Sequence, residues 1–251
     1  MSKTLIEGNP GFTRGLGKGT NLFIAEMFGD TIQGENFIGW PATFLRLQNC
    51  TLDCSWCDSV SVWRSGNPYT ISEVCDIFEK EGFIEKFRDG QRLVLTGGSP
   101  LKQQLELIDL IELFIERFGF KPYIEIENES VLPIHNKMIE CVDCWNNSPK
   151  LESSGNTKRA QYKPEVLKAL SNLENSWFKF VVTDDQDWDE IQRDFLDTNL
   201  IRKDQVILMP EGATREELMN TRELTVNLAI KYGVRFSERE HVVIWNKKTG
   251  V

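Results

Sequence analysis

The sequence contains no apolar run that approaches the roughly 18 to 20 residues needed to cross a bilayer. Residues 1–20 lack the hydrophobic stretch of a secretory signal, so we expect a cytosolic protein. An excess of basic residues is also missing, because 29 Lys and Arg stand against 38 Asp and Glu and give a net charge of −9. A general nucleic-acid or membrane-surface binder presents a basic face, so we expect neither kind of partner.

Low-complexity segments are absent too. The composition, 40% hydrophobic and 27% charged, is that of a soluble globular protein and excludes a disordered or fibrous chain. Strand-like and helix-like segments instead alternate along the sequence. The expected strands are residues 42–48, 92–96, 123–127, 178–183, 205–209 and 241–245, and the expected helices are residues 71–83, 105–118, 164–173, 187–196 and 214–232. We expect Ser72 to cap the first helix, and Thr214 with Glu217 to cap the last.

This order of elements predicts an α/β fold. A strand followed by a helix, repeated along the chain, implies parallel strands joined by helical crossovers. About six such strands favour an incomplete (β/α) barrel over a closed one. We expect a single domain over residues 21–251, preceded by an extended, glycine-rich arm over residues 1–20.

Three cysteines lie in one short loop after the first expected strand. Cys50, Cys54 and Cys57 follow the spacing C-x3-C-x2-C. Three thiolates this close together can each bind one iron of a [4Fe-4S] cluster. The fourth iron then stays free for the amino and carboxylate groups of S-adenosylmethionine, a cofactor of radical reactions.

Two other interpretations of the loop remain open, which are a structural zinc site and three buried thiols. Zinc prefers four ligands, and Cys141 with Cys144 offers a second pair. If residues 141–145 form a strand, however, these two thiols face opposite ways. We expect both to be buried structural thiols, and Cys75 to lie in a helix and the core.

The cysteine loop, with an aromatic residue before its last cysteine, resembles the signature of the radical S-adenosylmethionine superfamily. More narrowly, residues 26–59 are similar to the opening of the 7-carboxy-7-deazaguanine synthase family. Further stretches resemble that family in the same order: LTGGSP, NNSPKLESSG, FKFVV, LMPEG and HVVIWNKKTGV. The resemblance runs from about residue 23 to residue 251.

The resemblance implies a carbon–nitrogen lyase of deazapurine (queuosine-type) biosynthesis, with a barrel of the radical S-adenosylmethionine type. Such an enzyme contracts the ring of 6-carboxy-5,6,7,8-tetrahydropterin, releases ammonia and forms 7-carboxy-7-deazaguanine. It implies three cofactors, which are a [4Fe-4S] cluster, S-adenosylmethionine and Mg²⁺. The implied partners are the small pterin substrate, an electron donor such as flavodoxin, and a second copy of the chain in a homodimer.

The family pattern also implies which residues bind the substrate. For Arg46 the sequence itself supports this role. Strand alternation places Arg46 on the opposite face from Leu45 and Leu47, and an arginine on a barrel strand needs an anion such as the substrate carboxylate. The alternative is a structural ion pair. The implied substrate-binding residues are Ile32, Gln33, Gly34, Glu35, Arg46, Thr96, Glu127, His241 and Val251.

A second group of residues is implied to bind S-adenosylmethionine. Ser59 directly follows the cysteine loop and offers a hard oxygen, so we expect it to bind Mg²⁺, or alternatively to cap a helix. The implied S-adenosylmethionine-binding residues are Trp56, Cys57, Asp58, Gly98, Ser148, Pro149, Lys150, Met209, Pro210, Glu211 and Gly212.

The sequence departs from the family pattern at three places. Ser99 stands where an acidic residue is usual, which leaves a charge contact from that position in doubt. Residues 127–131, ENESV, stand where ETNGT is common, so that Glu127 is retained and the glycine is lost. Met209 stands where glutamine is common.

Two other functions remain open, the second of them because of these departures. A radical activase of a glycyl radical enzyme would share the cysteine loop without needing a pterin pocket. A non-catalytic relative would bind a cluster or a protein partner.

Overall fold

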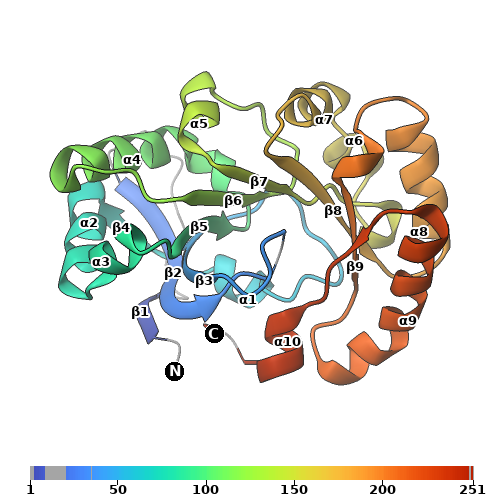
Figure 1. Ribbon diagram of the computed structural model, residues 1–251, viewed down its shortest axis with the longest axis horizontal. Coiled ribbons are helices and arrows are strands. Elements are labelled where there is room, and N and C mark those ends of the chain that lie inside the picture. The colour runs from blue at the N-terminus through green and yellow to red at the C-terminus, as the bar shows by residue number, and fades with distance from the viewer. Residues whose placement is uncertain (1–2, 9–20, 35, 249, 251) are drawn as a thin grey trace.

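The computed structural model describes residues 3–8, 21–34, 36–248 and 250 (Figure 1). Ten strands form one curved sheet in the order β1-β2-β3-β5-β6-β7-β8-β9-β10, and β4 pairs with the first residues of β2. The strands are β1 (Lys3–Glu7), β2 (Asn21–Ile32), β3 (Pro41–Leu47), β4 (Asn67–Thr70), β5 (Arg92–Gly97), β6 (Ile124–Asn128), β7 (Cys144–Asn147), β8 (Ser176–Val182), β9 (Val206–Pro210) and β10 (Arg235–Phe236).

Every pairing from β3 to β10 is parallel, whereas β1, β2 and β4 pair antiparallel. Parallel neighbours need long crossovers, and helices lie between most of them. The helices are α1 (Val60–Trp63), α2 (Ile71–Lys80), α3 (Phe83–Arg88), α4 (Gln104–Phe118), α5 (Asn136–Cys141), α6 (Lys158–Gln161), α7 (Pro164–Ser171), α8 (Gln186–Glu190), α9 (Arg215–Tyr232) and α10 (Glu240–Trp245). The predicted α/β fold with a mostly parallel sheet is confirmed.

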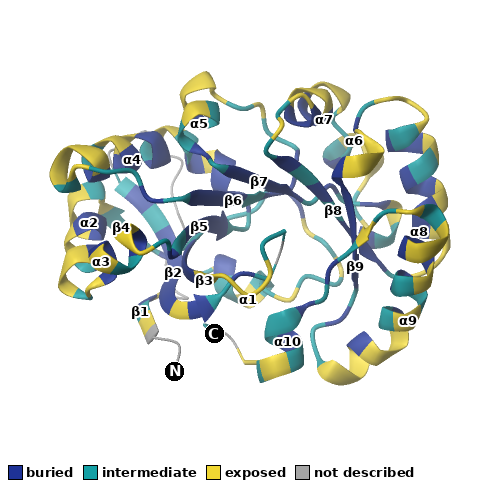
Figure 2. Ribbon diagram, viewed as in Figure 1, coloured by how far each residue is buried: buried dark blue, intermediate teal, exposed yellow. Residues whose placement is uncertain are grey.

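The core lies between the sheet and the helices around its outside. Figure 2 shows buried strands beneath helices whose outer faces are exposed. On α4, Leu107, Leu110, Ile111 and Phe114 are buried, as the helical periodicity of that segment predicts. None of the described helices is long and apolar enough to cross a membrane.

Most predicted elements are present with small shifts at their ends. Strands lie where residues 42–48, 92–96, 123–127, 178–183 and 205–209 predict them, and helices where residues 105–118, 164–173 and 214–232 do. Thr214 accepts a hydrogen bond from the Glu217 amide in the predicted capping box. The predicted helix over residues 187–196 is α8 followed by a π-helical turn at Ile191–Leu196.

Two local predictions are wrong, those for residues 241–245 and for Ser72, and the strand considered over residues 141–145 does not form. Residues 241–245 belong to α10, because a short apolar run does not distinguish a strand from a helix. Val242 is buried while Ile244 is exposed, although a strand would place both on one face. Cys141 ends α5 and Cys144 begins β7, so they do not share a strand, and Ser72 does not cap α2.

The predicted N-terminal arm is only partly described. Its residues Lys3–Glu7 form β1 and pair with β2, a long strand that the sequence analysis did not predict. Residues 9–20 lie outside the described part of the chain. The division into an arm and one domain stays a prediction.

The start of α2 gives a direct test of capping. Thr70 Oγ1 accepts a hydrogen bond from the Glu73 amide at 3.2 Å, and the Glu73 carboxylate accepts one from the Thr70 amide at 2.7 Å. Thr70→Ala should therefore lower the free energy of unfolding by about 1 kcal/mol in urea titrations. Ser72→Ala, two residues into the same helix, is the control and should change it by less than about 0.5 kcal/mol. Equal losses in the two variants would contradict the assignment of Thr70 as the cap.

Candidate active site

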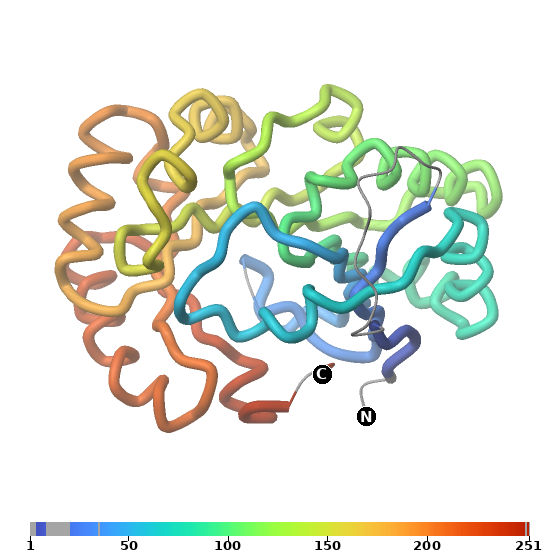
Figure 3. The backbone as a smooth tube through the Cα atoms, turned by 180° about the vertical axis from the view of Figure 1, so that it is seen from behind, coloured from blue at the N-terminus to red at the C-terminus, as the bar shows by residue number. Residues whose placement is uncertain are grey.

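One cavity opens where the parallel strands end, at the edge of the sheet where an α/β protein binds ligands. The loop after β3 crosses the middle of the molecule, as Figure 3 shows from behind, and several of its residues line the cavity. Most of the residues implied by the family pattern line this cavity: Ile32, Gln33, Gly34, Arg46, Thr96, Glu127 and His241, together with Cys50, Cys54, Trp56, Cys57, Asp58, Ser59, Gly98, Ser148, Lys150 and Met209.

Four implied residues do not line the cavity, namely Pro149, Pro210, Glu211 and Gly212. The last three turn the chain from β9 into α9: the Thr221 hydroxyl donates to the Glu211 carbonyl, and a side chain at Gly212 would lie 2.7 Å from the Leu218 amide. This motif therefore has a structural role in the turn. Glu35 and Val251 lie outside the described residues.

The cysteine loop packs tightly against the turn after β5. A side chain at Gly98 would place its Cβ 2.7 Å from the Cβ of Cys50, so only glycine permits this approach. The Ser99 amide donates to the Asn49 carbonyl at 2.8 Å and fastens the turn to the start of the loop.

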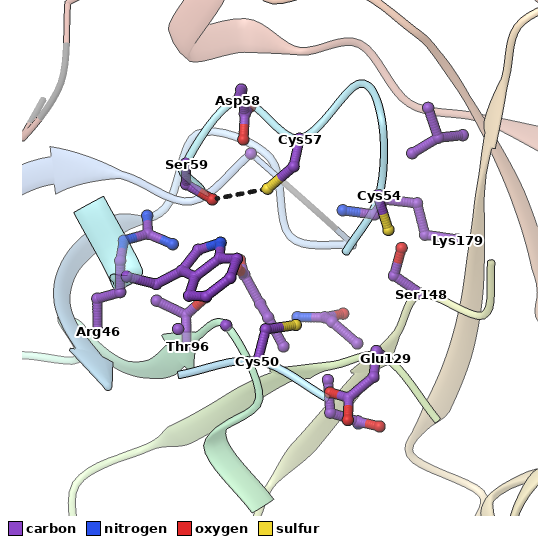
Figure 4. A pocket seen from close by; sticks show the side chains of 18 of the residues that line it. Arg46, Cys50, Cys54, Cys57, Asp58, Ser59, Thr96, Glu129, Ser148 and Lys179 are labelled. Atoms are coloured by element: carbon purple, nitrogen blue, oxygen red, sulfur yellow. Dashed lines mark hydrogen bonds between the residues drawn. The ribbon is translucent and has the colours of Figure 1, made fainter. Parts of the chain in front are cut away.

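Each of the three sulfur atoms has a polar neighbour. Cys50 Sγ accepts from the Ser99 hydroxyl at 3.5 Å, and Cys54 Sγ accepts from Asn156 Nδ2 at 3.2 Å. Cys57 Sγ lies 3.7 Å from Ser59 Oγ (Figure 4). Burial raises the pKa of the Cys50 and Cys54 thiols. Bound iron would offset this by stabilising the thiolates.

The donor set fits a cluster better than a single ion. Within the described chain, no three His, Cys, Asp or Glu side chains are close enough to hold one metal ion. Cys141 and Cys144, the second pair that a zinc site would need, do not line the cavity. Three thiols facing one cavity, each beside a hydrogen-bond donor, match the ligands of a cluster with one iron left for another ligand.

Arg46 takes part in the ion pair that the sequence left as an alternative. Its Nε lies 2.7 Å from Glu26 Oε1 on the neighbouring strand β2. Burial lowers the pKa of Arg46, but Glu26, followed by Glu127 and Asp58, outweighs burial and raises it. A guanidinium has five N–H donors, so a contact through Nε leaves capacity for a second anion. The structural ion pair and a substrate contact are therefore compatible.

Hydrogen bonds of the buried Gln33 side chain hold the start of the loop between β2 and β3. Gln33 is fully buried; its Nε2 donates to Glu125 Oε2 at 2.8 Å, and its Oε1 accepts from the Gly34 amide at 2.7 Å. Asn146 also donates to Glu125, at 3.0 Å. The Gln33 amide is thus used to hold the loop, which leaves the backbone around Gly34 to face the cavity.

An acid, a base and an arginine, namely Asp58, His241 and Arg239, lie together in the cavity. Arg239 donates to Asp58 Oδ2. Burial would raise the pKa of Asp58, but Arg239 and then His241 and Arg46 lower it to about 2. The pKa of His241 is lowered to about 4, first by burial and then by Arg239. Asp58 is therefore charged and His241 neutral near pH 7.

β10 and the residues directly after it contact the loop after β2. Arg235 Nη1 donates to Asn36 Oδ1 at 2.5 Å, and the Ser237 hydroxyl lies 3.4 Å from the Gly34 carbonyl oxygen. With the Arg239–Asp58 pair, these contacts join the end of the chain to the loops after β2 and β3.

Lys150, which the family pattern implies as a residue that binds S-adenosylmethionine, lines the cavity. Its Nζ donates to the Ser148 carbonyl at 2.6 Å and to the Ser148 hydroxyl at 2.7 Å, and it stands 5.8 Å from the centre of the Trp56 ring. Burial lowers its pKa.

The sequence analysis missed several residues of the cavity. Arg239 precedes His241 by two positions, and its charge in a segment already singled out was an available signal. The others lie on β2, β3, β6, β7 and β8 or directly after them, and the order of these strands in the sheet was not known. These residues are Phe28, Phe44, Asn128, Glu129, Asn146, Lys179 and Arg239.

A mostly parallel α/β sheet, with a three-cysteine loop facing a cavity at the ends of its strands, defines the class of radical S-adenosylmethionine enzymes. Similarity to known proteins shows to which family within this class the chain belongs. The 7-carboxy-7-deazaguanine synthase of Halobacterium salinarum is 32% identical to this chain, over 92% of this chain and 93% of its own. The chain belongs to the 7-carboxy-7-deazaguanine synthase family.

Other relatives agree. The 7-carboxy-7-deazaguanine synthase of Pyrobaculum aerophilum is 28% identical over 90% of this chain and 96% of its own. The crystal structure of QueE from Escherichia coli shares the fold, with a TM-score of 0.63 at 22% identity over 88% of this chain and 94% of that one. No family model matches the sequence. The alternative function as a glycyl radical activase is not supported by these relatives.

The low pKa of His241 predicts a loss of stability in mild acid. In the unfolded chain a histidine takes up a proton near pH 6.5, whereas folded His241 does so near pH 4, so acidification between these values favours unfolding. Relative to His241→Gln, the wild-type protein should lose up to about 3 kcal/mol of unfolding free energy between pH 7 and pH 4, measured by urea titration. Parallel pH profiles for the two proteins would show that His241 is not buried as described.

Proposed function

We propose that this enzyme converts 6-carboxy-5,6,7,8-tetrahydropterin to 7-carboxy-7-deazaguanine by radical ring contraction with loss of ammonia, within queuosine-type deazapurine biosynthesis. The observation that carries the proposal is that the three-thiol loop and the Arg46 guanidinium line one cavity. A cluster site and a carboxylate-binding residue thus lie within reach of one small substrate. The curved run of parallel strands supports the finer assignment of an incomplete (β/α) barrel, and we treat residues 21–251 as its single domain.

The cofactors follow from the donor atoms. Cys50, Cys54 and Cys57 would hold a [4Fe-4S] cluster, whose free iron would take the amino-acid part of S-adenosylmethionine. Together these groups supply the one-electron chemistry that removes and returns a substrate hydrogen atom. Ser59 lines the cavity beside Cys57 without making a side-chain cap to α1, so its hydroxyl is available for Mg²⁺.

The chain's own side chains would position the substrate. Arg46 binds its carboxylate, and Thr96 and Glu127, joined by a 2.9 Å hydrogen bond, present polar atoms from adjacent strand ends. The stacked rings of Phe28 and Phe44, 5.1 Å apart, form an apolar wall for a planar bicycle. His241, neutral near pH 7, and the backbone at Gly34 would meet the ring nitrogens and oxygens.

The remaining partners are those that this chemistry requires. The cluster needs a one-electron donor such as flavodoxin, which we propose works with this enzyme in the cytoplasm. We also propose a homodimer, without direct contact to nucleic acid or membrane.

Anaerobic reconstitution tests the proposal. With iron and sulfide, the protein should bind one [4Fe-4S] cluster; with S-adenosylmethionine, a reductant, Mg²⁺ and the carboxypterin it should yield 7-carboxy-7-deazaguanine, identified by mass. A triple Cys50→Ala, Cys54→Ala, Cys57→Ala variant should lose the cluster, whereas Cys141→Ala should retain it. A wild-type protein that holds its cluster and makes no product would point to the non-catalytic relative.

Arg46 gives the sharpest test of substrate binding. Arg46→Ala should weaken binding of the carboxypterin about 10-fold to 150-fold, because a charge-assisted hydrogen bond contributes about 1.5 to 3 kcal/mol. Arg46→Lys should restore part of this affinity, since an ammonium lacks the planar fork. Binding is measured by equilibrium dialysis with the reconstituted protein.

The control separates this contact from the ion pair. Glu26→Gln removes the structural partner of Arg46 but keeps the guanidinium, so it should lower stability without weakening substrate binding. Unchanged affinity in Arg46→Ala would show that Arg46 serves the ion pair alone.

A further inference from the structure

A third carboxylate in the cavity, beside Asp58 and Glu127, has no role in the site described so far. Glu129 follows β6, lines the cavity beside the cysteine loop, and is 4% exposed (Figure 4). Its Oε1 accepts a hydrogen bond from the Thr51 hydroxyl at 2.7 Å. Its Oε2 is buried and has no hydrogen-bond partner among the described residues.

A buried carboxylate oxygen without a donor is unfavourable by itself. Lys150 interacts electrostatically with Glu129, but its Nζ donates its hydrogen bonds to Ser148. The arrangement therefore leaves the charge of Glu129 for a cation or a hydrogen-bond donor that enters the cavity with a ligand.

Glu129 is joined to position 99 by a single residue. The Thr51 hydroxyl that contacts Glu129 also lies 3.0 Å from Ser99 Oγ, and the Thr51 amide donates to Ser99 Oγ at 2.8 Å. Ser99 is fully buried, does not line the cavity, and reaches Cys50 Sγ with its hydroxyl. Residue 99, where an acidic side chain is usual, thus supports the cysteine loop through Cys50, while the carboxylate that lines the cavity here belongs to Glu129.

The loop that carries Glu129 contains a residue with a positive φ angle. Ser130 has φ = 63°, a left-handed conformation that glycine adopts more easily, and it stands where the family pattern has glycine. The backbone turn is therefore retained although the residue types have changed, and the side chain of residue 129 is presented at the end of β6.

We propose that Glu129 binds the ammonium group of S-adenosylmethionine, in place of the acidic residue that is missing at position 99. This inference rests on the proposed function, because it requires the cofactor to bind beside Cys50. The ligand class is an α-amino acid whose ammonium lies next to the cluster-binding loop. The carboxylate would pair with that ammonium through Oε2, while Thr51 holds Oε1 in place.

Binding measurements on the reconstituted protein test this role without turnover. S-adenosylhomocysteine carries the amino-acid group, and 5′-methylthioadenosine lacks it, so comparison of the two isolates that group. Glu129→Gln should weaken binding of S-adenosylhomocysteine about 10-fold to 100-fold, as expected when a charged partner becomes neutral, and leave 5′-methylthioadenosine unaffected. Glu116→Gln, an exposed substitution on α4, is the matched control and should change neither affinity.

Moving the carboxylate from residue 129 to residue 99, where an acidic side chain is usual, should restore cofactor binding. Ser99→Glu combined with Glu129→Gln should recover much of the affinity for S-adenosylhomocysteine. Because Ser99 is fully buried, this double variant can fail to fold, and Glu129→Asp then serves instead. A shorter carboxylate should give an affinity between those of the wild type and Glu129→Gln.

The outcomes separate this inference from the proposed function. If the wild type binds S-adenosylhomocysteine and makes product, but Glu129→Gln binds it equally well, Glu129 has no role with the ammonium. Equal weakening of both ligands in Glu129→Gln would show that Glu129 only supports the loop through Thr51. A wild type with an intact cluster and no affinity for S-adenosylhomocysteine would overturn the proposed function as well.

Discussion

The close packing of the turn after β5 against the cysteine loop is the constraint on which the site depends. Gly98 lies so near Asn49 and Cys50 that no side chain fits between them. Two neighbouring parallel strands, β3 and β5, thereby fix where the first thiol stands. The other strand ends are placed relative to this pair by the register of the sheet, so the polar residues of the cavity take their positions from it.

The sequence predicted the parts of the fold that have a strong local signal. The periodicity of α4 and the capping box of α9 are local patterns, and both appear as expected. The long strand β2 was missed because it is buried along much of both faces and lacks alternation. The helix α10 was predicted as a strand because five residues are too few for periodicity to decide.

Local motifs in the sequence indicated many of the residues that line the cavity, but not which of them the sheet brings into contact. The three cysteines and Ser59 are close in sequence, and they line the same cavity. By contrast, the pairing of Arg46 with Glu26 depends on the register between β2 and β3. Glu129 was passed over because it differs from the family pattern, and its place beside Thr51 is visible only in three dimensions.

The contacts made by residues 235–239 have a consequence for how the site tolerates change. Strand pairing does not join β10 to β2 among the described strands, so side chains bridge that opening. The Arg239–Asp58 pair connects residues 181 positions apart, and Asp58 directly follows Cys57. The sequence just after the last strand is therefore coupled to the cysteine loop. Insertions or substitutions there therefore change the position of the Cys57 thiol, although they lie far from it in the sequence.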